Sequence, residues 1–135
     1  LVLTLAIKDF TPMIDHTGIN VSNFENSKEF YIKALAPLGY QLLKEFGDSI
    51  AGFGIDGEPD FWMMQAEVHT PRIHIAFRTK NRDMVREFYT AALEIGGRDN
   101  GAPGLRTHYH PNYYAAFILD PDGHNIEAVC HAPIE

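Results

Sequence analysis

Residues 120–131 read DPDGHNIEAVCH, a tight acidic turn that runs directly into an apolar, alternating segment. The Asp-Pro-Asp-Gly start is typical of a turn, and the alternation after it predicts the last strand of the protein. Ile126 and Ala128 would share one face of this strand, which leaves Glu127 on the other face. A buried carboxylate needs a partner. Glu127 is therefore the first candidate for a functional residue, whereas His124 is expected to brace the turn through hydrogen bonds.

The same segment is part of an internal repeat. Residues 14–40 align with residues 72–98 at an offset of 58, which matches His16 with His74. Residues 51–64 align with residues 115–128 at an offset of 64, so the second half has extra residues, which we place in the Gly-Pro loop at 100–112. Two similar halves predict two similar structural modules.

Each half has the pattern of a strand, a helix and further short strands. Helices are predicted at about 23–36, where Ser22 and Glu25 have the spacing of a capping box, and at about 81–95. The fold class is therefore α+β, with two tandem βαβββ modules. The patterned segment opens near Met13, so residues 1–12 are expected to be an extension or leader. Residues 13–135 are expected to form one domain, with modules at about 13–68 and 69–131.

Three polar residues are predicted to share the strand faces that point away from the helices. His16 and His74 occupy equivalent positions of the repeat, and Glu127 has the same orientation in the last strand. Two imidazoles and one carboxylate with open positions are a typical ligand set for a divalent metal ion. The structural alternative for each histidine is an ordinary hydrogen-bonded residue on a strand.

The repeat, the histidines at the strand starts and above all DPDGHNIE at 120–127 resemble the glyoxalase, bleomycin-resistance and extradiol-dioxygenase superfamily, also called the vicinal oxygen chelate superfamily. The resemblance implies a cupped mixed sheet with helices on its outer face and a homodimer. It also implies one divalent metal ion (Fe, Zn, Ni, Mn or Co) held by His16, His74 and Glu127.

Glyoxalase I itself usually has a second carboxylate at the counterpart of Glu127. The offset of 64 places Met63 there, and a thioether is neither a base nor a good ligand for a hard ion. Glyoxalase I chemistry is therefore not expected, although a shift of one or two residues in the alignment would bring Asp60 or Gln65 to this position.

The resemblance leaves two function classes open. The first is a metal-dependent lyase, isomerase or dioxygenase whose small substrate chelates the metal through vicinal oxygens. The second is a metal-free binding protein of the bleomycin-resistance type, which sequesters an aromatic or cationic ligand. The intact set of His16, His74 and Glu127 favours the enzyme.

Other candidates surround these residues. A general acid or base is expected among His108, His110 and Tyr114, and Trp62, Met63 and Tyr113 are candidates for substrate binding. The alternative for the aromatic residues and Met63 is core packing, and for the histidines a surface turn.

Composition limits the partners. The formal net charge of −7 argues against nucleic acids and anionic membrane surfaces and favours a small-molecule substrate. A single cysteine, Cys130, cannot form an internal disulfide, and no apolar run is long enough to span a bilayer. A cytoplasmic location is the expectation.

Overall fold

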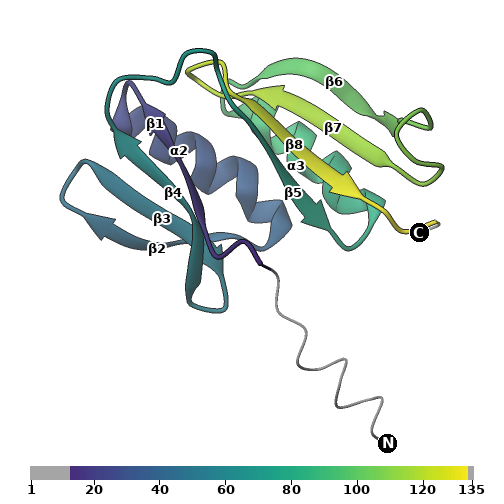
Figure 1. The fold of residues 1–135 in the computed structure, drawn as a ribbon, viewed down its shortest axis with the longest axis horizontal. Coiled ribbons are helices and arrows are strands. Elements are labelled where there is room, and N and C mark those ends of the chain that lie inside the picture. Colours follow the sequence, from purple (N-terminus) through teal and green to yellow (C-terminus); the bar gives the residue numbers. More distant parts are fainter. Residues whose placement is uncertain (1–12, 134–135) are drawn as a thin grey trace, which may run out of the picture.

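The computed structural model describes residues 13–133, and its elements follow the order expected from the repeat (Figure 1). The expected extension at 1–12 lies outside these residues. The fold class is confirmed as two tandem βαβββ modules. The first module contains β1 (Thr17–Val21), α2 (Phe24–Leu35), the 3-10 helix η1 (Ala36–Leu38), β2 (Gln41–Phe46), β3 (Ile50–Ile55) and β4 (Glu58–Gln65). The second contains β5 (His74–Thr79), α3 (Arg82–Glu94), β6 (Arg98–Leu105), β7 (Tyr114–Leu119) and β8 (Asn125–Cys130).

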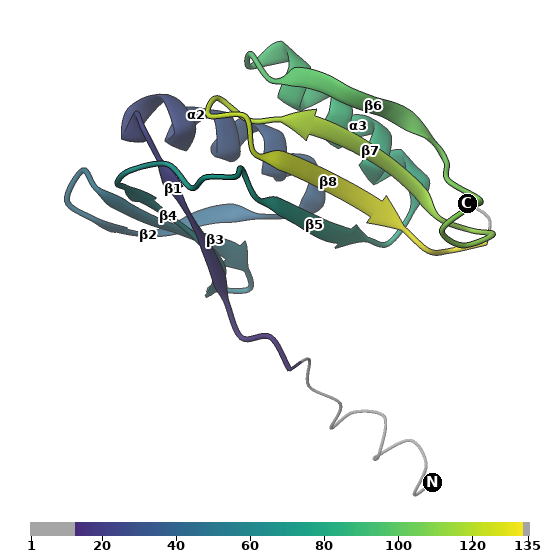
Figure 2. The same ribbon diagram turned by 45° about the horizontal axis from the view of Figure 1, so that its top comes forward.

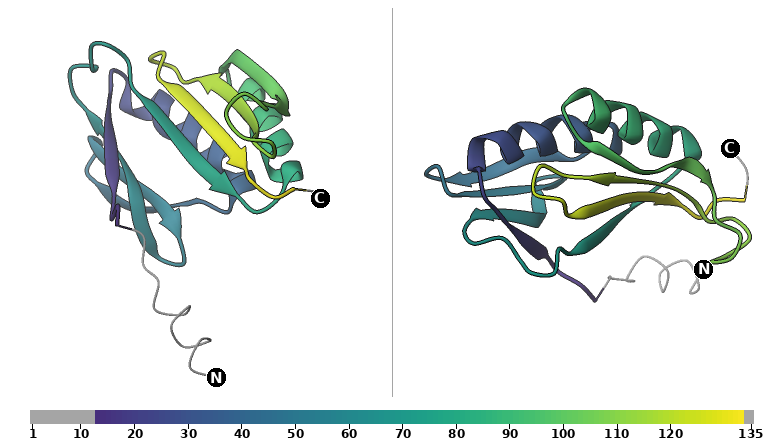
Figure 3. Two further views of the ribbon diagram at one scale, coloured as in Figure 1. Left: turned by 45° about the vertical axis from the view of Figure 1, so that its right-hand side comes forward. Right: turned by 90° about the horizontal axis from the view of Figure 1, so that it is seen from above.

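Each module forms its own four-stranded mixed sheet. The strand orders are β1-β4-β3-β2 and β5-β8-β7-β6, in which β1 pairs parallel with β4 and β5 pairs parallel with β8. The first strand of each module is thus an edge strand, and these two edges lie toward the centre of the molecule (Figure 1). Both helices cover the same side of the two sheets (Figures 2 and 3). The opposite side carries the strand faces on which the sequence places its polar candidates.

The helix starts are set by asparagine side chains. Asn23 accepts a hydrogen bond from the backbone N–H of Asn26, and Asn81 accepts one from Met84. These N-caps satisfy amide groups that have no partner within a helix. The expected capping box at Ser22 is not formed, because the Ser22 hydroxyl donates to the Asp122 carboxylate at 2.5 Å instead.

One apolar core joins the two modules. The ring of Phe61 in the first module packs edge-on against Tyr31, at 5.0 Å between centroids, and against Phe77 of the second module, at 5.4 Å. Tyr40 also contacts Phe77 edge-on. Such aromatic pairs add stability beyond the area they bury. Within residues 13–133, no helix is long and apolar enough to cross a membrane.

The turn at 120–124 fastens the second module to the first. The Asp120 carboxylate is 1% exposed, and it accepts hydrogen bonds from the Tyr31 hydroxyl at 2.5 Å and from the backbone N–H groups of Asp122 and His124 at 2.9 and 2.8 Å. Asp122 in turn accepts from the backbone and the hydroxyl of Ser22. We call Ser22, Tyr31, Asp120, Asp122 and His124 the module clasp.

His124 completes the clasp as a fully buried, neutral donor and acceptor. Its Nδ1 accepts from the backbone N–H of Ile73 at 3.2 Å, so its Nε2–H donates to the carbonyl oxygen of Asn20 at 3.1 Å. The ring therefore connects β1 to the segment before β5. The DPDGH motif holds the two modules together.

Stability is expected to fall as the pH rises above about 10, because burial and the adjacent Asp120 carboxylate raise the pKa of Tyr31 well above its ordinary value. An unfolded tyrosine ionises near pH 10 while the folded one keeps its proton, so its contribution is fully present below that pH. Each further pH unit removes up to about 1.4 kcal/mol. Urea unfolding between about pH 8 and 11 tests this. Tyr31→Phe should show a shallower decline, and equal slopes would contradict the assignment.

Candidate active site

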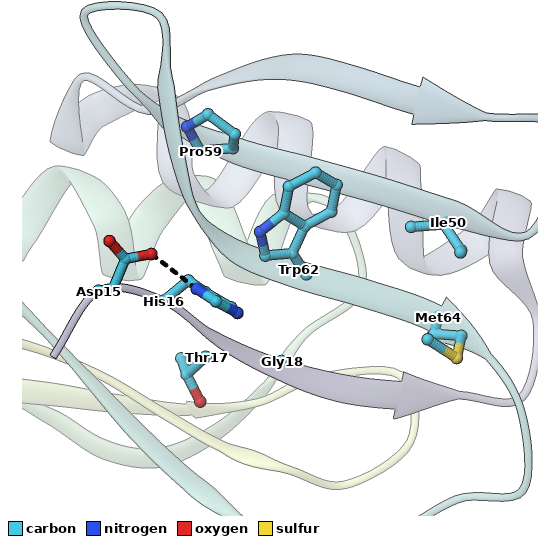
Figure 4. Close-up of a pocket in the computed structure, with 8 residues that line it drawn as sticks. All are labelled: Asp15, His16, Thr17, Gly18, Ile50, Pro59, Trp62 and Met64. Carbon is cyan, nitrogen blue, oxygen red and sulfur yellow. Dashed lines mark hydrogen bonds and ion pairs between the residues drawn. The ribbon is translucent and has the colours of Figure 1, made fainter.

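Two pockets open on the side of the sheets that the helices leave uncovered. One, of about 660 Å³, lies on the first module and is lined by Asp15, His16, Thr17, Gly18, Ile50, Pro59, Trp62 and Met64 (Figure 4). The other, of about 470 Å³, lies on the second module and is lined by His74, Tyr109, Tyr113, Phe117, Asn125 and Glu127. Each pocket thus contains at least one of the metal ligands predicted from the sequence.

The second-module pocket is centred on a buried carboxylate. Glu127 is 1% exposed, and one of its oxygens, Oε1, lies 2.8 Å from Nε2 of His74, whose side chain is 52% exposed. The Tyr113 hydroxyl donates to the other oxygen, Oε2. Partial burial and this hydrogen bond raise the pKa of Tyr113 to about 12, so the phenol acts as a donor at neutral pH. Both carboxylate oxygens are therefore held in fixed directions.

Strand register brings these groups together. Glu127 on β8 pairs with Ala76 on β5 and Phe117 on β7, and His74 lies two residues before Ala76 on the same face of β5. Ile126 and Ala128 point into the core, as the alternation predicted. The alternation of side chains along β5 and β8 is thus enough to place His74 beside Glu127.

The first-module pocket holds an oriented histidine. Nδ1 of His16 donates to the Asp15 carboxylate at 2.7 Å, and the pair lies beside Trp62 (Figure 4). In the neutral ring this hydrogen bond puts the proton on Nδ1 and leaves Nε2 with its lone pair, the arrangement that metal-binding histidines usually have.

The three predicted ligands are not assembled in this chain. His74 and Glu127 are together, whereas His16 lines the other pocket, on the other sheet. Across residues 13–133, no three His, Cys, Asp or Glu side chains form a group that could hold a metal ion. The sequence left open whether His16, His74 and Glu127 meet within one chain or across a dimer, so their common metal site stays a prediction. Strand alternation fixes the faces of each sheet but not the position of one sheet relative to the other.

The position of Met63 also differs from the expectation. Met63 is fully buried in the core, and its neighbours Trp62 and Met64 line the pocket. Trp62 pairs with Gly18 just as Glu127 pairs with Ala76, so the true counterpart of Glu127 is Trp62, one residue from the alignment. A shift by one residue exchanges the two faces of a strand.

Neither Asp60 nor Gln65, the alternatives that a shifted alignment offered, serves as a second ligand. Asp60 accepts a hydrogen bond from the Tyr40 hydroxyl at 3.0 Å. Gln65 accepts from the backbone N–H of Phe24 and donates to the carbonyl oxygen of Ser22. Both side chains serve the fold of the first module, so neither stands at the counterpart position of Glu127.

The candidates for acid or base lie outside both pockets. His108 packs against Tyr109, and His110 accepts from the backbone N–H of Asn112 and packs against His131. The guanidinium groups of Arg82 and Arg86 lie 5.0 and 5.5 Å from the centre of the Tyr114 ring, and Arg86 donates to its hydroxyl. Tyr114 thus holds helix α3 to the sheet, and the expected catalytic position next to Glu127 is occupied by Tyr113.

Several pocket residues were absent from the sequence prediction, namely Asp15, Met64, Tyr109 and Phe117. Phe117 could have been found, since it shares the face of Glu127, and Asn125, two residues before Glu127, was expected on that face. Asp15 and Tyr109 lie in segments that precede strands. In such segments no alternation predicts the direction of a side chain.

Comparison with known proteins agrees with this architecture. A glyoxalase/bleomycin resistance protein from Albidiferax ferrireducens is 23% identical, with 90% of this chain and 100% of that chain covered and a TM-score of 0.76. A glyoxalase/bleomycin resistance protein/dioxygenase family enzyme from Burkholderia phytofirmans is 16% identical (88% and 98% covered, TM-score 0.68), and so is a lactoylglutathione lyase from Agrobacterium tumefaciens (90% and 96% covered, TM-score 0.63).

At these identities the solved structures establish the fold alone. The family model of the Glyoxalase/Bleomycin resistance protein/Dioxygenase superfamily, however, matches residues 13–128, which span both modules up to the last two residues of β8 and contain the clasp and both pockets. With its tandem βαβββ modules and the DPDGHNIE turn and strand in place, this chain belongs to the Glyoxalase/Bleomycin resistance protein/Dioxygenase superfamily.

Proposed function

We propose that this protein is a metal-dependent enzyme whose small substrate chelates a divalent ion through vicinal oxygens. The observation that carries the proposal is the buried Glu127 carboxylate, which faces an open pocket together with Nε2 of His74. A buried carboxylate is costly for a fold, and proteins retain such groups most often where a charge partner or ligand requires them.

The spacing of these two groups suits a shared ion. Ligand atoms that each lie about 2.0–2.2 Å from one metal ion, at about a right angle, are roughly 3 Å apart. The 2.8 Å between His74 Nε2 and Glu127 Oε1 is close to this value. Tyr113 already engages Oε2, so Glu127 would offer one oxygen. The same contact is a hydrogen bond from Nε2–H of His74 to the carboxylate, so a bound ion would replace that proton, and His74 and Glu127 would then supply one half of a divalent metal site.

The remaining protein ligand is proposed to be His16 of a second copy. In its neutral form His16 has the tautomer of a metal ligand. Apart from Asp15, however, no other residue that lines its pocket carries a carboxylate or an imidazole that could bind the same ion. A symmetric dimer in which the first-module pocket of one copy faces the second-module pocket of the other would create two equal sites. Such an arrangement uses all three histidine and glutamate ligands implied by the family.

The bound ion would supply Lewis-acid polarisation of the substrate oxygens. The chain itself holds the site: Tyr113 fixes Glu127, Asp15 fixes His16, and Phe117 closes the apolar side of the second-module pocket against the His74 ring. Trp62 stands where glyoxalase I has its second carboxylate, so an isomerase that needs a carboxylate base there is disfavoured. Lyase or dioxygenase chemistry is preferred.

Metal content is the direct test. Protein purified without chelators is expected to hold about one divalent ion per chain, and His16→Ala, His74→Ala and Glu127→Gln should each lose more than about 10-fold in affinity, because three protein ligands leave little redundancy. Elemental analysis and titration calorimetry measure this. Iron would direct activity assays to oxygen uptake, and zinc, nickel, manganese or cobalt to lyase assays.

His108→Ala is the matched control, since it removes an imidazole from the loop beside the second-module pocket without touching Glu127. It should bind the metal as the wild type does. If the wild type binds no ion even after reconstitution, the second candidate holds: a metal-free protein that sequesters its ligand. The volume of the first-module pocket, about 660 Å³, favours that candidate because it is large enough for a drug-sized molecule.

A further inference from the structure

Arg106 is held in a fixed position by the glycine-rich strand β6. Its guanidinium donates through Nη1 to the carbonyl oxygen of Gly104 and through Nη2 to that of Ala102, both at 2.8 Å. A Cβ atom at Gly104 would lie 3.1 Å from Nη1, and one at Gly101 would lie 3.1 Å from Nη2, closer than most Cβ atoms in proteins come to another atom. Glycine at both positions therefore leaves the space that the guanidinium occupies.

This position is next to the second-module pocket. The guanidinium carbon lies 5.4 Å from the centre of the Phe117 ring, which lines the pocket. The backbone N–H of Arg106 donates to the carbonyl oxygen of Tyr113 at 2.7 Å, and its own carbonyl oxygen accepts from the N–H of Tyr109 at 3.0 Å. Both tyrosines also line the pocket. The His74 ring lies 6.3 Å from the same Phe117 ring, so one aromatic ring is next to both the guanidinium and a proposed metal ligand.

The guanidinium keeps donors that the fold does not use. An arginine side chain has five N–H donors, and the carbonyl oxygens of β6 accept from two of them. Within residues 13–133, no carboxylate lies within 4 Å of this guanidinium, whereas the cations of Lys28 and Arg86 both have such a partner. A partly buried cation that is fixed in place and lacks an acidic partner is suited to bind an anion.

We infer that Arg106 is a specificity residue of the second-module pocket and binds an anionic oxygen group of the substrate, such as a carboxylate. The inference rests on the proposed function for the place of the vicinal oxygens, at an ion held by His74 and Glu127. A planar guanidinium can offer two parallel N–H groups to an anion. The pocket volume of about 470 Å³ has room for a small molecule with both features.

A purely structural role for Arg106 is the alternative. Its two hydrogen bonds could serve only to hold β6, whose pairing with β7 is irregular at two places. The two roles differ in their effect on a neutral ligand. Loss of a structural arginine would weaken every ligand of the pocket to a similar extent, whereas loss of an anion-binding arginine would weaken only the anionic ligand.

The probes are 3,4-dihydroxybenzoate and 3,4-dihydroxybenzamide, which share a ring and two vicinal hydroxyl groups and differ in charge at the opposite end. Titration calorimetry is carried out on protein loaded with zinc, which has no redox chemistry, and on metal-stripped protein. We expect the zinc-loaded protein to bind the carboxylate at least about 10-fold more tightly than the amide, as the strength of a charge-assisted hydrogen bond implies.

One variant and one matched control complete the experiment. Arg106→Gln removes the charge but keeps an amide that can donate to a carbonyl oxygen of β6. It should reduce the preference for the carboxylate to less than about 2-fold while the affinity for the neutral probe changes by less than about 2-fold. Lys33→Gln removes one positive charge from an exposed position on α2, on the other side of the sheets, and should keep the full preference. Circular dichroism verifies that both variants are folded.

Equal weakening of both probes in Arg106→Gln would overturn the inference, because a structural role predicts that result. An unchanged preference in Arg106→Gln, a lost preference in Lys33→Gln, or a wild type that binds neither probe or both equally would overturn it too. The proposed function fails separately. If metal-stripped and zinc-loaded protein bind the probes equally well, the vicinal oxygens have no ion to chelate, but a carboxylate preference that depends on Arg106 would still support the inference.

Discussion

Replacing Asp120 with alanine is expected to lower the free energy of unfolding by about 3–5 kcal/mol, a large part of the stability of a small domain. The Asp120 carboxylate is 1% exposed and accepts three hydrogen bonds, from Tyr31 and from the backbone of Asp122 and His124. Alanine would leave these donors buried without a partner and would create a cavity at the junction of the modules. Urea unfolding followed by fluorescence and circular dichroism measures the loss.

Matched variants separate the clasp from a general effect of charge. Asp48→Ala removes a carboxylate from an exposed turn and should change stability by less than about 0.5 kcal/mol. Tyr31→Phe removes only one of the three donors and should cost about 1–3 kcal/mol. A loss below about 1 kcal/mol in Asp120→Ala would show that the clasp does not hold the modules together.

Pairing two inactive variants is expected to restore metal binding. His16→Ala and Glu127→Gln each lack one ligand, so neither homodimer should hold an ion tightly. If each site takes His16 from one copy and His74 and Glu127 from the other, a dimer with one chain of each variant has one intact site. That heterodimer should hold about half of the wild-type metal content.

Two affinity tags on co-expressed chains allow the heterodimer to be isolated. The control pairs His74→Ala with Glu127→Gln: because these residues belong to the same half-site, both sites of that heterodimer stay incomplete and no metal should return. Restoration in the control, or none in the test pair, would contradict a site shared between copies. Metal bound by neither pair but fully by the wild type would place all three ligands in one chain.

Much of the second-module site could be predicted from the sequence because it depends on local geometry. Alternation in two strands puts His74 and Glu127 on the same face, and the parallel pairing of β5 with β8 then sets them 2.8 Å apart. The module order and both helices followed from hydrophobic periodicity and the repeat. Such patterns lie within single segments, so they can be recognised even when the predicted end of an element is slightly wrong.

The errors came from features that depend on contacts between distant residues. Ser22 had capping-box spacing but is bound by Asp122, which lies 100 residues away. The gapped alignment misplaced β4 by one residue, which is enough to exchange Met63 in the core for Trp62 at the pocket. Tyr114 was expected to be a catalytic residue, but its ring contacts two arginines of α3 instead of lining a pocket.

By itself the sequence determined the two βαβββ modules, the buried carboxylate strand and the histidine beside it, because side-chain alternation and helical periodicity act over a few neighbouring residues. Only the tertiary structure decided that His16, just before β1, lines a pocket separate from that of Glu127, that the Trp62 indole lies over Gly52, and that Asp120 fastens the modules together. These positions depend on how two separately formed sheets pack against each other, and no pattern within one strand or helix predicts that packing.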